Sequence, residues 1–297
     1  MPGRLTSFLS DGLGNQLFIL GSSLAIASSN KLELEFDLSW FAAPQPGRSR
    51  PQDRRDPIIL EYPEISERFR FRGLSRHRIA NVVNRARGRL ERSVSVDVDE
   101  CVTLPDLPPG SRVIGHMLRP DWFAHLHQEL RRLISLEPTL ESECLGTIHT
   151  LRKTAGRVVA VHVRRGDRVT PGRMDGVLAP EYFLQVLQRL RANPDSVLIF
   201  SDSPEWCRNA QVFSGMRVIE EERAHVVLRL MSLADDLVLS PSTLSWWAGW
   251  LCDSESKRIV VPEPFQPASP SRWTRLVMPT WQSHPGIFLQ HDHPRGE

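Results

Sequence analysis

The stretch VVAVHV at residues 158–163 is apolar without interruption and is followed at once by the charged sequence RRGD. A half-exposed strand alternates apolar and polar residues, whereas this run predicts a parallel strand that helices cover on both faces. Shorter runs of the same kind recur in SVLIFSD, DLVLSPST and RIVVPEPF, with helical patterns between them. These repeated strand–helix units predict a doubly wound, parallel α/β domain in the second half of the chain.

The helices of this domain are marked by apolar residues at helical spacing. A helix predicted over residues 180–191 has five such side chains on one face: Tyr182, Phe183, Val186, Leu187 and Leu190. Further helices are predicted to begin near Glu205 and to span residues 225–234 and 244–252, and MRVIEEE predicts a short strand. RIVVPEPF is predicted to be the last strand of the sheet.

The first half follows the same plan. A strand near residues 5–9 leads into the glycine turn of DGLGNQLF and then into an amphipathic helix. KLELEFDL and SRVIGHML predict further strands, a helix through Leu126 and Leu130 should follow, and residues 58–83 give mixed signals. We therefore expect two Rossmann-like domains, residues 1–150 and residues 151–297.

The charge is unevenly distributed along the chain. The formal net charge of the 297 residues is only +2, which predicts no polyanionic partner. Residues 48–92, however, contain thirteen arginines, six acidic residues and no lysine. We interpret this segment as a solvated insert in the first domain; the alternative is that it binds phosphate groups or nucleic acid. Because only Phe69 and Phe71 interleave aromatic rings with these charges, no nucleic-acid partner is expected.

Cysteine usage and hydropathy indicate a cytoplasmic protein. The longest uncharged stretch, residues 12–30, contains Asn15, Gln16 and several serines, so it predicts a core helix rather than a membrane span or signal peptide. No integral membrane segment is expected, and the oligomeric state is left open. Four scattered cysteines form no C-x-x-C pair, which argues against a zinc site or a disulfide framework: Cys101, Cys144, Cys207 and Cys252.

Three strands of the second half end in polar residues. Because ligands of a doubly wound sheet bind beyond the carboxyl ends of its strands, these residues are candidates for a single site. An arginine fork suits phosphate oxygens, and so do hydroxyl groups at a helix N-terminus. The set predicts a site for an anion and a polar ring: His162, Arg164, Arg165 and Asp167; Ser201 and Asp202; Ser240, Ser242, Thr243 and Ser245.

Several features have a structural interpretation beside the functional one. Asp202 can accept the paired N–H donors of a guanine edge, or it can cap the next helix. The glycines of GLGNQ can serve a tight turn or the close approach of a ligand, since they match neither a dinucleotide nor a Walker motif. Trp246, Trp247 and Trp250 have spacing typical of core packing, although indoles also stack on sugars. Neither Asp235–Asp236 nor the HDH sequence at residues 291–293 is expected to bind metal.

Four motifs together resemble those of the bacterial α-1,2-fucosyltransferase family: GLGNQLF, HVRRGD, IFSDSPEW and LMSLADDLVLSPSTLSWWAGWL, in this order. The resemblance implies a glycosyltransferase B fold, with two Rossmann-like domains facing across a cleft. It further implies inverting transfer of L-fucose from GDP-fucose to a galactoside hydroxyl in α-1,2 linkage, without a metal or other cofactor. The expected partners are a GDP-sugar, bound by the C-terminal domain, and a carbohydrate acceptor on the N-terminal side.

The resemblance also implies roles for individual residues. Arg164 is expected to hold the β-phosphate and to assist departure of the diphosphate, and His162 is expected to face the nucleotide. Asp167 and Asp175 are the candidates for the catalytic base. The remaining donor-binding positions are Arg165 in the same motif, Asp202 near guanine, Ser242, Thr243 and Ser245 in the phosphate loop, and Gly12, Gly14, Asn15 and Gln16 in the N-terminal loop.

The motifs also depart from the family pattern. Arg168 replaces the tyrosine of HxRRGDY, Ser203 replaces the second aspartate of SDD, and SPSTLSWWAGW replaces the commoner NSSFSWWGAW. Two alternatives therefore stay open: transfer of another GDP-linked sugar, and a nucleotide-sugar-binding protein without catalysis.

Overall fold

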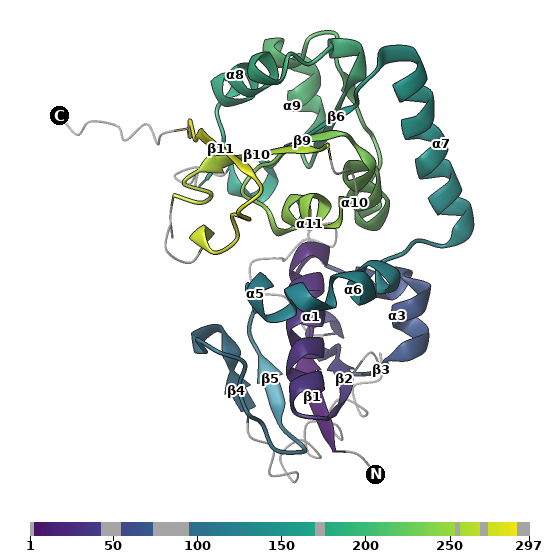
Figure 1. Ribbon diagram of the computed structural model, residues 1–297, viewed down its shortest axis with the longest axis vertical. Helices are drawn as coiled ribbons and strands as arrows, with labels where there is room; N and C mark the ends of the chain where they lie inside the picture. The colour runs from purple at the N-terminus through teal and green to yellow at the C-terminus, as the bar shows by residue number, and fades with distance from the viewer. Residues whose placement is uncertain are drawn as a thin grey trace, which may run out of the picture. The chain divides into compact units, whose positions relative to one another are not determined.

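The chain forms two compact units, which the computed structural model describes over residues 3–42, 55–73, 95–169, 176–252, 256–267 and 273–289 (Figure 1). Unit 1 comprises Met1–Glu137 and unit 2 comprises Pro138–Glu297. The expected boundary at residue 150 falls inside helix α7 (Pro138–Ala155), which belongs wholly to unit 2. Helix α7 packs on α10 (Ala224–Leu233), and an ion pair between Glu141 and Arg229 joins the two helices. These contacts explain why α7 groups with the second sheet.

In the described part of unit 2, six parallel strands form one sheet in the order β11-β10-β9-β6-β7-β8. From the middle of the sheet, β6, β7 and β8 follow one another toward one edge, and β9, β10 and β11 follow one another toward the other edge. The topological switch point therefore lies between β6 and β9. The strands are β6 (Val159–Val163), β7 (Val197–Ser201), β8 (Arg217–Val218), β9 (Asp236–Val238), β10 (Arg258–Glu263) and β11 (Gln282–Pro285).

Strand β11 corrects the expectation that RIVVPEPF is the last strand. Its sequence, QSHP, has no buried residue and therefore carries no apolar signal. It pairs with β10 in parallel at the edge of the sheet, where backbone hydrogen bonds alone specify a strand.

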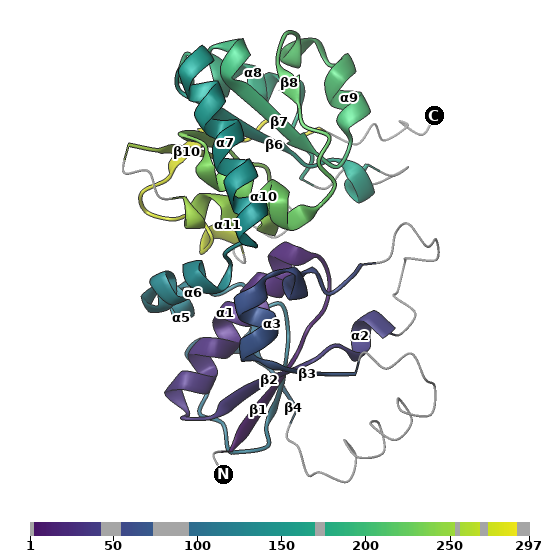
Figure 2. The ribbon, with the colours of Figure 1, turned by 90° about the vertical axis from the view of Figure 1, so that its right-hand side faces the viewer.

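Helices cover both faces of this sheet, as the uninterrupted apolar run predicts (Figure 2). Val161 and Val163 of β6 pack in one cluster with Tyr182 and Val186 of α8 (Pro180–Leu190), and Cys207 of α9 (Pro204–Asn209) joins the same cluster. Because side chains alternate along a strand, the His162 side chain lies on the opposite face, on the side of α10 and α11 (Thr243–Leu251).

The three tryptophans of α11 are part of the core. Trp246 and Trp247 are fully buried and Trp250 is nearly so. The Trp246 indole N–H donates to the carbonyl oxygen of Leu276 at 2.6 Å, and its ring packs against Trp281. The core-packing interpretation is therefore confirmed for this helix.

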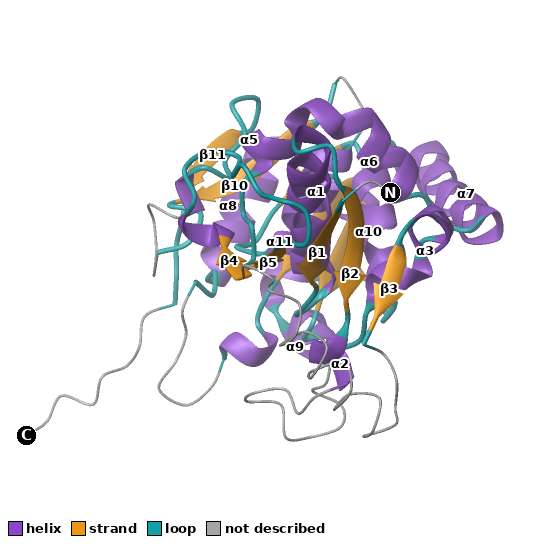
Figure 3. Cartoon of the chain, turned by 90° about the horizontal axis from the view of Figure 1, so that it is seen from below, coloured by secondary structure: helices purple, strands orange, loops and turns teal. Residues whose placement is uncertain are grey.

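Unit 1 repeats the plan with five described parallel strands in the order β3-β2-β1-β5-β4. Figure 3 shows β1, β2 and β3 as neighbours, with α1 and α3 on one side of them. The switch point of this sheet lies between β1 and β5. The strands are β1 (Arg4–Phe8), β2 (Glu33–Asp37), β3 (Arg70–Arg72), β4 (Ser95–Asp97) and β5 (Arg112–Ile114).

Helix α1 (Leu13–Ser29) forms the core of unit 1, with 14 of its 17 residues buried. It contacts α5 (Pro120–Phe123), while α3 (Pro63–Arg68) contacts α6 (His127–Leu133); α2 (Ser39–Ala42) follows β2. None of the helices in the described segments is both long enough and apolar enough to cross a membrane. All four cysteines are free thiols.

Candidate nucleotide-sugar site

Hydroxyl groups of neighbouring strands hold the residues at the switch point of unit 2. Ser240, which follows β9, donates to the His162 carbonyl oxygen at 2.5 Å and accepts from the Arg164 backbone N–H at 3.3 Å. Ser201, at the end of β7, donates to the Val163 carbonyl oxygen at 2.8 Å. These bonds extend the pairing of β6 beyond its last residue, so they fix the direction in which Arg164 leaves the sheet.

Arg164 is held between two carboxylates. Its guanidinium donates to Asp202 and to Asp167, and its side chain is 21% exposed. Asp202 also accepts from the Arg165 backbone N–H at 2.9 Å. Asp202 therefore does not cap α9, whose N-cap residue is Ser203. Each oxygen of Asp202 thus accepts a hydrogen bond, one of them from the Arg164 guanidinium.

Gly166 is fixed by its close approach to the same carboxylate. A Cβ atom built at this position would lie 2.4 Å from Oδ2 of Asp202, and the backbone has φ +22°. The Gly166 N–H donates to the Ser203 hydroxyl at 3.2 Å. Any larger residue would push Asp202 away, so the RRGD turn and the strand tip of β7 form one rigid corner.

His162 is a buried, neutral imidazole at neutral pH. Burial lowers its pKa from the ordinary 6.5 to about 4, and Arg164 and Arg168 add to this effect while Asp202 opposes it. Its Nδ1 atom is buried and has no hydrogen-bond partner among the residues that the structure describes. An unpaired buried ring nitrogen is unfavourable, and a polar ligand atom placed there would remove the penalty.

Arg165 turns away from Arg164 and stacks on an aromatic ring. Its guanidinium carbon lies 3.8 Å from the centroid of the Trp206 indole, and burial lowers its pKa. The Nη1 atom of Arg165 is buried without a hydrogen-bond partner in the described part of the chain. Sequence reasoning missed Trp206; its signal was the tryptophan of IFSDSPEW, two residues into the helix after Asp202.

The hydroxyls at the start of α11 have different surroundings. Ser242 caps the helix by accepting from the Leu244 N–H at 3.3 Å. Ser245 is fully buried and donates to the carbonyl oxygens of Ser240 and Ser242. Thr243 is half-buried, and its hydroxyl has no partner among the described residues. Ser245 thus shapes the loop from within, while Thr243 is the hydroxyl with capacity for a ligand.

The N-terminal loop of unit 1 is held by Gln16. Its fully buried side chain donates to the carbonyl oxygens of Asp11 and Asp56, both at 2.8 Å, and accepts from the Ile59 N–H at 3.0 Å. This amide therefore acts through the loop it holds. Gly12 faces open space, Gly14 is buried and Asn15 is half-buried in the first turn of α1.

The amino end of the unit 2 sheet carries a second arginine–aspartate cluster. Asp236 is fully buried and accepts two hydrogen bonds from the Arg157 guanidinium, at 2.7 and 2.8 Å, and further ones from Arg258. Burial opposes the ionisation of Asp236, but the bonds from Arg258 and Arg157 outweigh it and hold its pKa below the usual value. Asp235 likewise pairs with Arg152. Both aspartates are thus bound by arginines. Asp175 and residues 291–293 lie outside the described residues.

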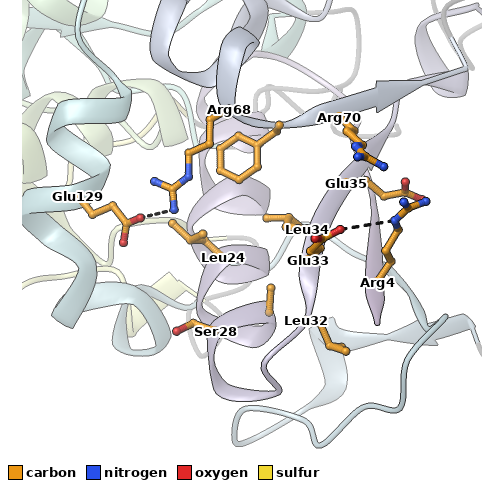
Figure 4. A pocket seen from close by; sticks show the side chains of 12 residues that line it. Arg4, Leu24, Ser28, Leu32, Glu33, Leu34, Glu35, Arg68, Arg70 and Glu129 are labelled. Atoms are coloured by element: carbon orange, nitrogen blue, oxygen red, sulfur yellow. Dashed lines mark ion pairs between the residues drawn. The ribbon is translucent and has the colours of Figure 1, made fainter. Parts of the chain in front are cut away.

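A hollow of about 520 Å³ in unit 1 lies away from the switch point of the unit 1 sheet (Figure 4). It is lined by Arg4 and Glu33, the first residues of β1 and β2, and so lies toward the amino ends of these strands. Four of its six charged groups pair with one another, Arg4 with Glu33 at 3.7 Å and Arg68 with Glu129 at 2.6 Å. The carboxyl edges of the two sheets are therefore the better candidates for chemistry.

Two curated Escherichia coli proteins are similar to part of the chain. One is an alpha-1,2-colitosyltransferase, 28% identical over 137 residues that cover 40% of this chain and 47% of that protein. The other is the O-antigen biosynthesis glycosyltransferase WbnK, 26% identical over 137 residues that cover 41% of this chain and 43% of that protein. The chain thus matches a little under half the length of either relative.

Solved structures agree with the fold. The chain is similar to a mutant of Arabidopsis thaliana FUT1 in complex with GDP, with a TM-score of 0.54, 14% identity and coverage of 90% of this chain and 73% of that chain. It is also similar to the Escherichia coli ADP-heptose LPS heptosyltransferase II, with a TM-score of 0.50, 11% identity and coverage of 95% and 90%. The fold is that of the glycosyltransferase B enzymes, as the motifs imply.

A family model describes more than half of the chain. It matches residues 113–281, which include the last helices of unit 1 and the strands and helices of unit 2 from α7 to β10, and which end just before β11. Three of the four motifs that suggested the family, HVRRGD, IFSDSPEW and SPSTLSWW, fall inside this match, and GLGNQLF, at residues 12–18, lies outside it. The chain belongs to glycosyl transferase family 11.

Proposed function

We propose that the protein transfers L-fucose from GDP-fucose to a hydroxyl of a carbohydrate acceptor, with inversion, in α-1,2 linkage to a galactoside and without a metal ion. Unit 2 binds the GDP-sugar, and unit 1 carries the acceptor side. Family membership supports a glycosyltransferase. The observation that carries the donor assignment is the position of Arg164, a half-buried arginine at the switch point of a doubly wound sheet.

The reaction requires positive charge at the leaving group. When the bond between the anomeric carbon and the β-phosphate oxygen breaks, negative charge builds on the diphosphate while the sugar becomes positively charged. Arg164 can place a planar pair of N–H donors on phosphate oxygens. The first turn of α11, with Thr243 and the helix dipole, can neutralise the same charge.

Donor binding requires an exchange of partners at Arg164. Its guanidinium is neutralised by Asp167 and Asp202. A diphosphate that takes over Arg164 leaves Asp202 available for the N1–H and N2–H groups of guanine. The neutral His162 below them can bond to the ligand through Nδ1 without adding charge.

One of the relatives bears on both the linkage and the sugar. The alpha-1,2-colitosyltransferase among the relatives supports an α-1,2 linkage and also makes another GDP-linked sugar the first alternative to fucose. A nucleotide-sugar-binding protein without catalysis is the second alternative. Competition between GDP-fucose and other GDP-sugars, followed by product analysis, separates these three possibilities.

The donor assignment is tested by thermal stabilisation with GDP, GDP-fucose, GDP-mannose, UDP and ADP in the presence of EDTA. A ligand at a hundred times its dissociation constant adds about 2.7 kcal/mol to the free energy of unfolding. We expect this for GDP ligands alone, and we expect Arg164→Ala to abolish it. Arg208→Ala is the matched control, because Arg208 lies in the same unit and pairs with the exposed Glu220. Failure of every GDP ligand to stabilise the wild-type protein would overturn the assignment.

A further inference from the structure

A histidine held between two aspartates lies at the switch point of unit 1. His116 follows β5, and its Nε2 atom lies 3.0 Å from Oδ2 of Asp11, which follows β1. On the other side, Nδ1 of His116 lies 3.7 Å from Oδ2 of Asp99. The imidazole remains 43% exposed. Strands β1 and β5 are neighbours from which the two halves of the sheet diverge, so the cluster occupies the position where such sheets bind ligands.

The backbone around this cluster is strained in a way that fixes its side chains. Asp11 has φ +63° and Met117, next to His116, has φ +52°. Non-glycine residues in this region cost free energy and persist where the surrounding structure holds them. Asp99 stabilises this conformation, because its carboxylate accepts hydrogen bonds from the backbone N–H groups of His116, at 3.0 Å, and of Met117, at 2.6 Å. Gln16 fixes the other side by binding the Asp11 carbonyl oxygen.

The charge of the cluster determines which member can accept a proton. The hydrogen bonds to Asp11 and then to Asp99 raise the pKa of His116 from the ordinary 6.5 to about 9, against the effect of burial. The imidazole is therefore protonated at neutral pH and cannot itself act as a base. It donates to Asp11 and orients that carboxylate, in the way a third residue orients the base of a catalytic triad.

We propose that Asp11 is the base that accepts the proton of the acceptor hydroxyl, and that His116 and Asp99 are its positioning residues. This inference rests on the proposed glycosyl transfer. The acceptor oxygen forms a bond with the anomeric carbon, the bond from that carbon to the β-phosphate oxygen breaks, and its electron pair leaves with GDP. The hydroxyl proton passes to the Asp11 carboxylate. The assignment differs from the expectation from sequence, in which Asp167 or Asp175 is the base.

The surroundings of Asp167 favour Asp11 over it. Asp167 is bound by Arg164, and its side chain is 52% exposed. A carboxylate that shares the arginine proposed to bind the diphosphate lies on the leaving-group side of the reaction. Asp11, in contrast, belongs to the unit that is left to bind the acceptor.

The test exploits the left-handed backbone of Asp11. Asparagine and glycine are the residues that best tolerate a positive φ, so Asp11→Asn and Asp11→Gly should both fold. The measurements are the dissociation constant for GDP, the rate of GDP release from GDP-fucose with lactose or with water alone as acceptor, and rescue of Asp11→Gly by formate. Glu100→Gln is the matched control, since Glu100 is an exposed carboxylate in the same turn as Asp99.

We expect Asp11→Asn to lower kcat by at least about a hundredfold, the usual range for loss of a general base, while KM for GDP-fucose stays within about twofold. Formate should restore part of the rate of Asp11→Gly, which a structural role would not allow. His116→Gln should lower kcat by about tenfold and leave the donor KM unchanged.

Three outcomes would each contradict one of the two proposals. A rate for Asp11→Asn within about threefold of the wild-type rate would overturn the assignment of the base, since a base is worth at least about a hundredfold. A wild-type protein that binds GDP but releases none from GDP-fucose would overturn the assignment as well, and would leave the donor site standing. A wild-type protein that does not bind GDP would instead refute the proposed function itself.

Discussion

Each end of the unit 2 sheet carries a cluster of arginine and aspartate side chains, but the two clusters differ in burial and in whether their hydrogen bonds are satisfied. At the amino end, Asp236 is fully buried and bound by two arginines, and the bonds of its carboxylate are satisfied. At the carboxyl end, Arg164 is bound by Asp202 and Asp167, but the cluster is partly exposed and the neighbouring His162 has an unpaired buried nitrogen. An arginine–aspartate pair alone therefore does not identify a functional site.

What separates the two clusters is the capacity to take a further partner. A carboxylate saturated by two arginine forks inside the fold has no room for a ligand, and removing it leaves two cations without a counter-ion. A partly exposed arginine can exchange a carboxylate for a phosphate at small cost. Substitution of one residue in each cluster tests whether the two clusters differ in this way.

The largest effect should come from the amino end. We expect Asp236→Ala to lower the free energy of unfolding by about 3 kcal/mol, because it leaves Arg157 and Arg258 without their buried partner. The affinity for GDP should change by less than about twofold, since distant sites act independently. Urea unfolding and GDP titration measure the two quantities. A loss of GDP binding in a variant that is still folded would show that the two ends are not independent.

Arg164→Ala should have the opposite profile. Loss of a preorganised donor at the leaving group should reduce kcat by about a hundredfold or more. The free energy of unfolding should change by less than about 1 kcal/mol, because the side chain is partly exposed. Arg164→Lys keeps the charge without the planar fork and should fall between the two rates. Equal rates for wild type and Arg164→Ala would remove Arg164 from the reaction.

A smaller effect is expected at Asp202. Asp202→Asn should weaken GDP binding about tenfold, the amount for one charge-assisted hydrogen bond, and should reduce the preference for GDP over inosine diphosphate, which lacks the 2-amino group. Calorimetric titration of both nucleotides measures the preference. Tighter GDP binding by the variant would instead mean that Asp202 serves only as a counter-ion of Arg164.

The smallest effect should be a pH dependence of the free energy of unfolding, caused by His162 at the carboxyl end of the unit 2 sheet. Because the pKa of His162 is about 4 in the folded protein and about 6.5 in the unfolded chain, the unfolded state binds more protons between these values. Stability is then lost as the pH falls below 6.5, by about 1 kcal/mol from pH 7 to pH 5.5. Asp236 stays ionised in this window, so the amino end adds no slope.

Urea unfolding of wild type and His162→Gln at the two pH values isolates this contribution from those of the other histidines. The variant should lack the part of the slope that His162 supplies. Identical slopes in the two proteins would show that His162 is protonated in the same way in the folded and unfolded states.

The elements of unit 2 could be predicted because their signals are local. β6, β7, α8 and α10 are apolar runs or amphipathic patterns, and all were expected near their observed positions. β11 and β4 could not be predicted in this way, since short edge strands such as QSHP and SVD are specified by pairing with a neighbour. Helix α7 has only three buried residues among 18, so its sequence gave little periodicity to detect.

The sequence predicted which site residues lie at the ends of strands, but it did not predict the contacts between their side chains. The sequence places His162 near the end of β6, Arg164 just after β6 and Asp202 after β7, and the structure brings Arg164 and Asp202 into contact. The tryptophan of IFSDSPEW is visible in the sequence, but its stacking with Arg165 depends on the orientation of both side chains, which a sequence pattern does not give. In the Asp11–His116–Asp99 cluster, Asp11 and His116 are 105 residues apart in the sequence. The pairing of β5 with β1 on one side and with β4 on the other brings the three residues together.

The three backbone bonds of Gln16 also change how its motif is used to identify related chains. The amide of this residue joins the turn at Asp11 to the chain at Asp56 and Ile59, so the fold of unit 1 requires it whether or not a substrate ever binds. A descendant of this protein that had lost its enzymatic activity would still need the glutamine of GLGNQ. That motif is thus a marker of ancestry, and a search for active relatives should look instead at the residues that stand where Asp11 and Arg164 stand here.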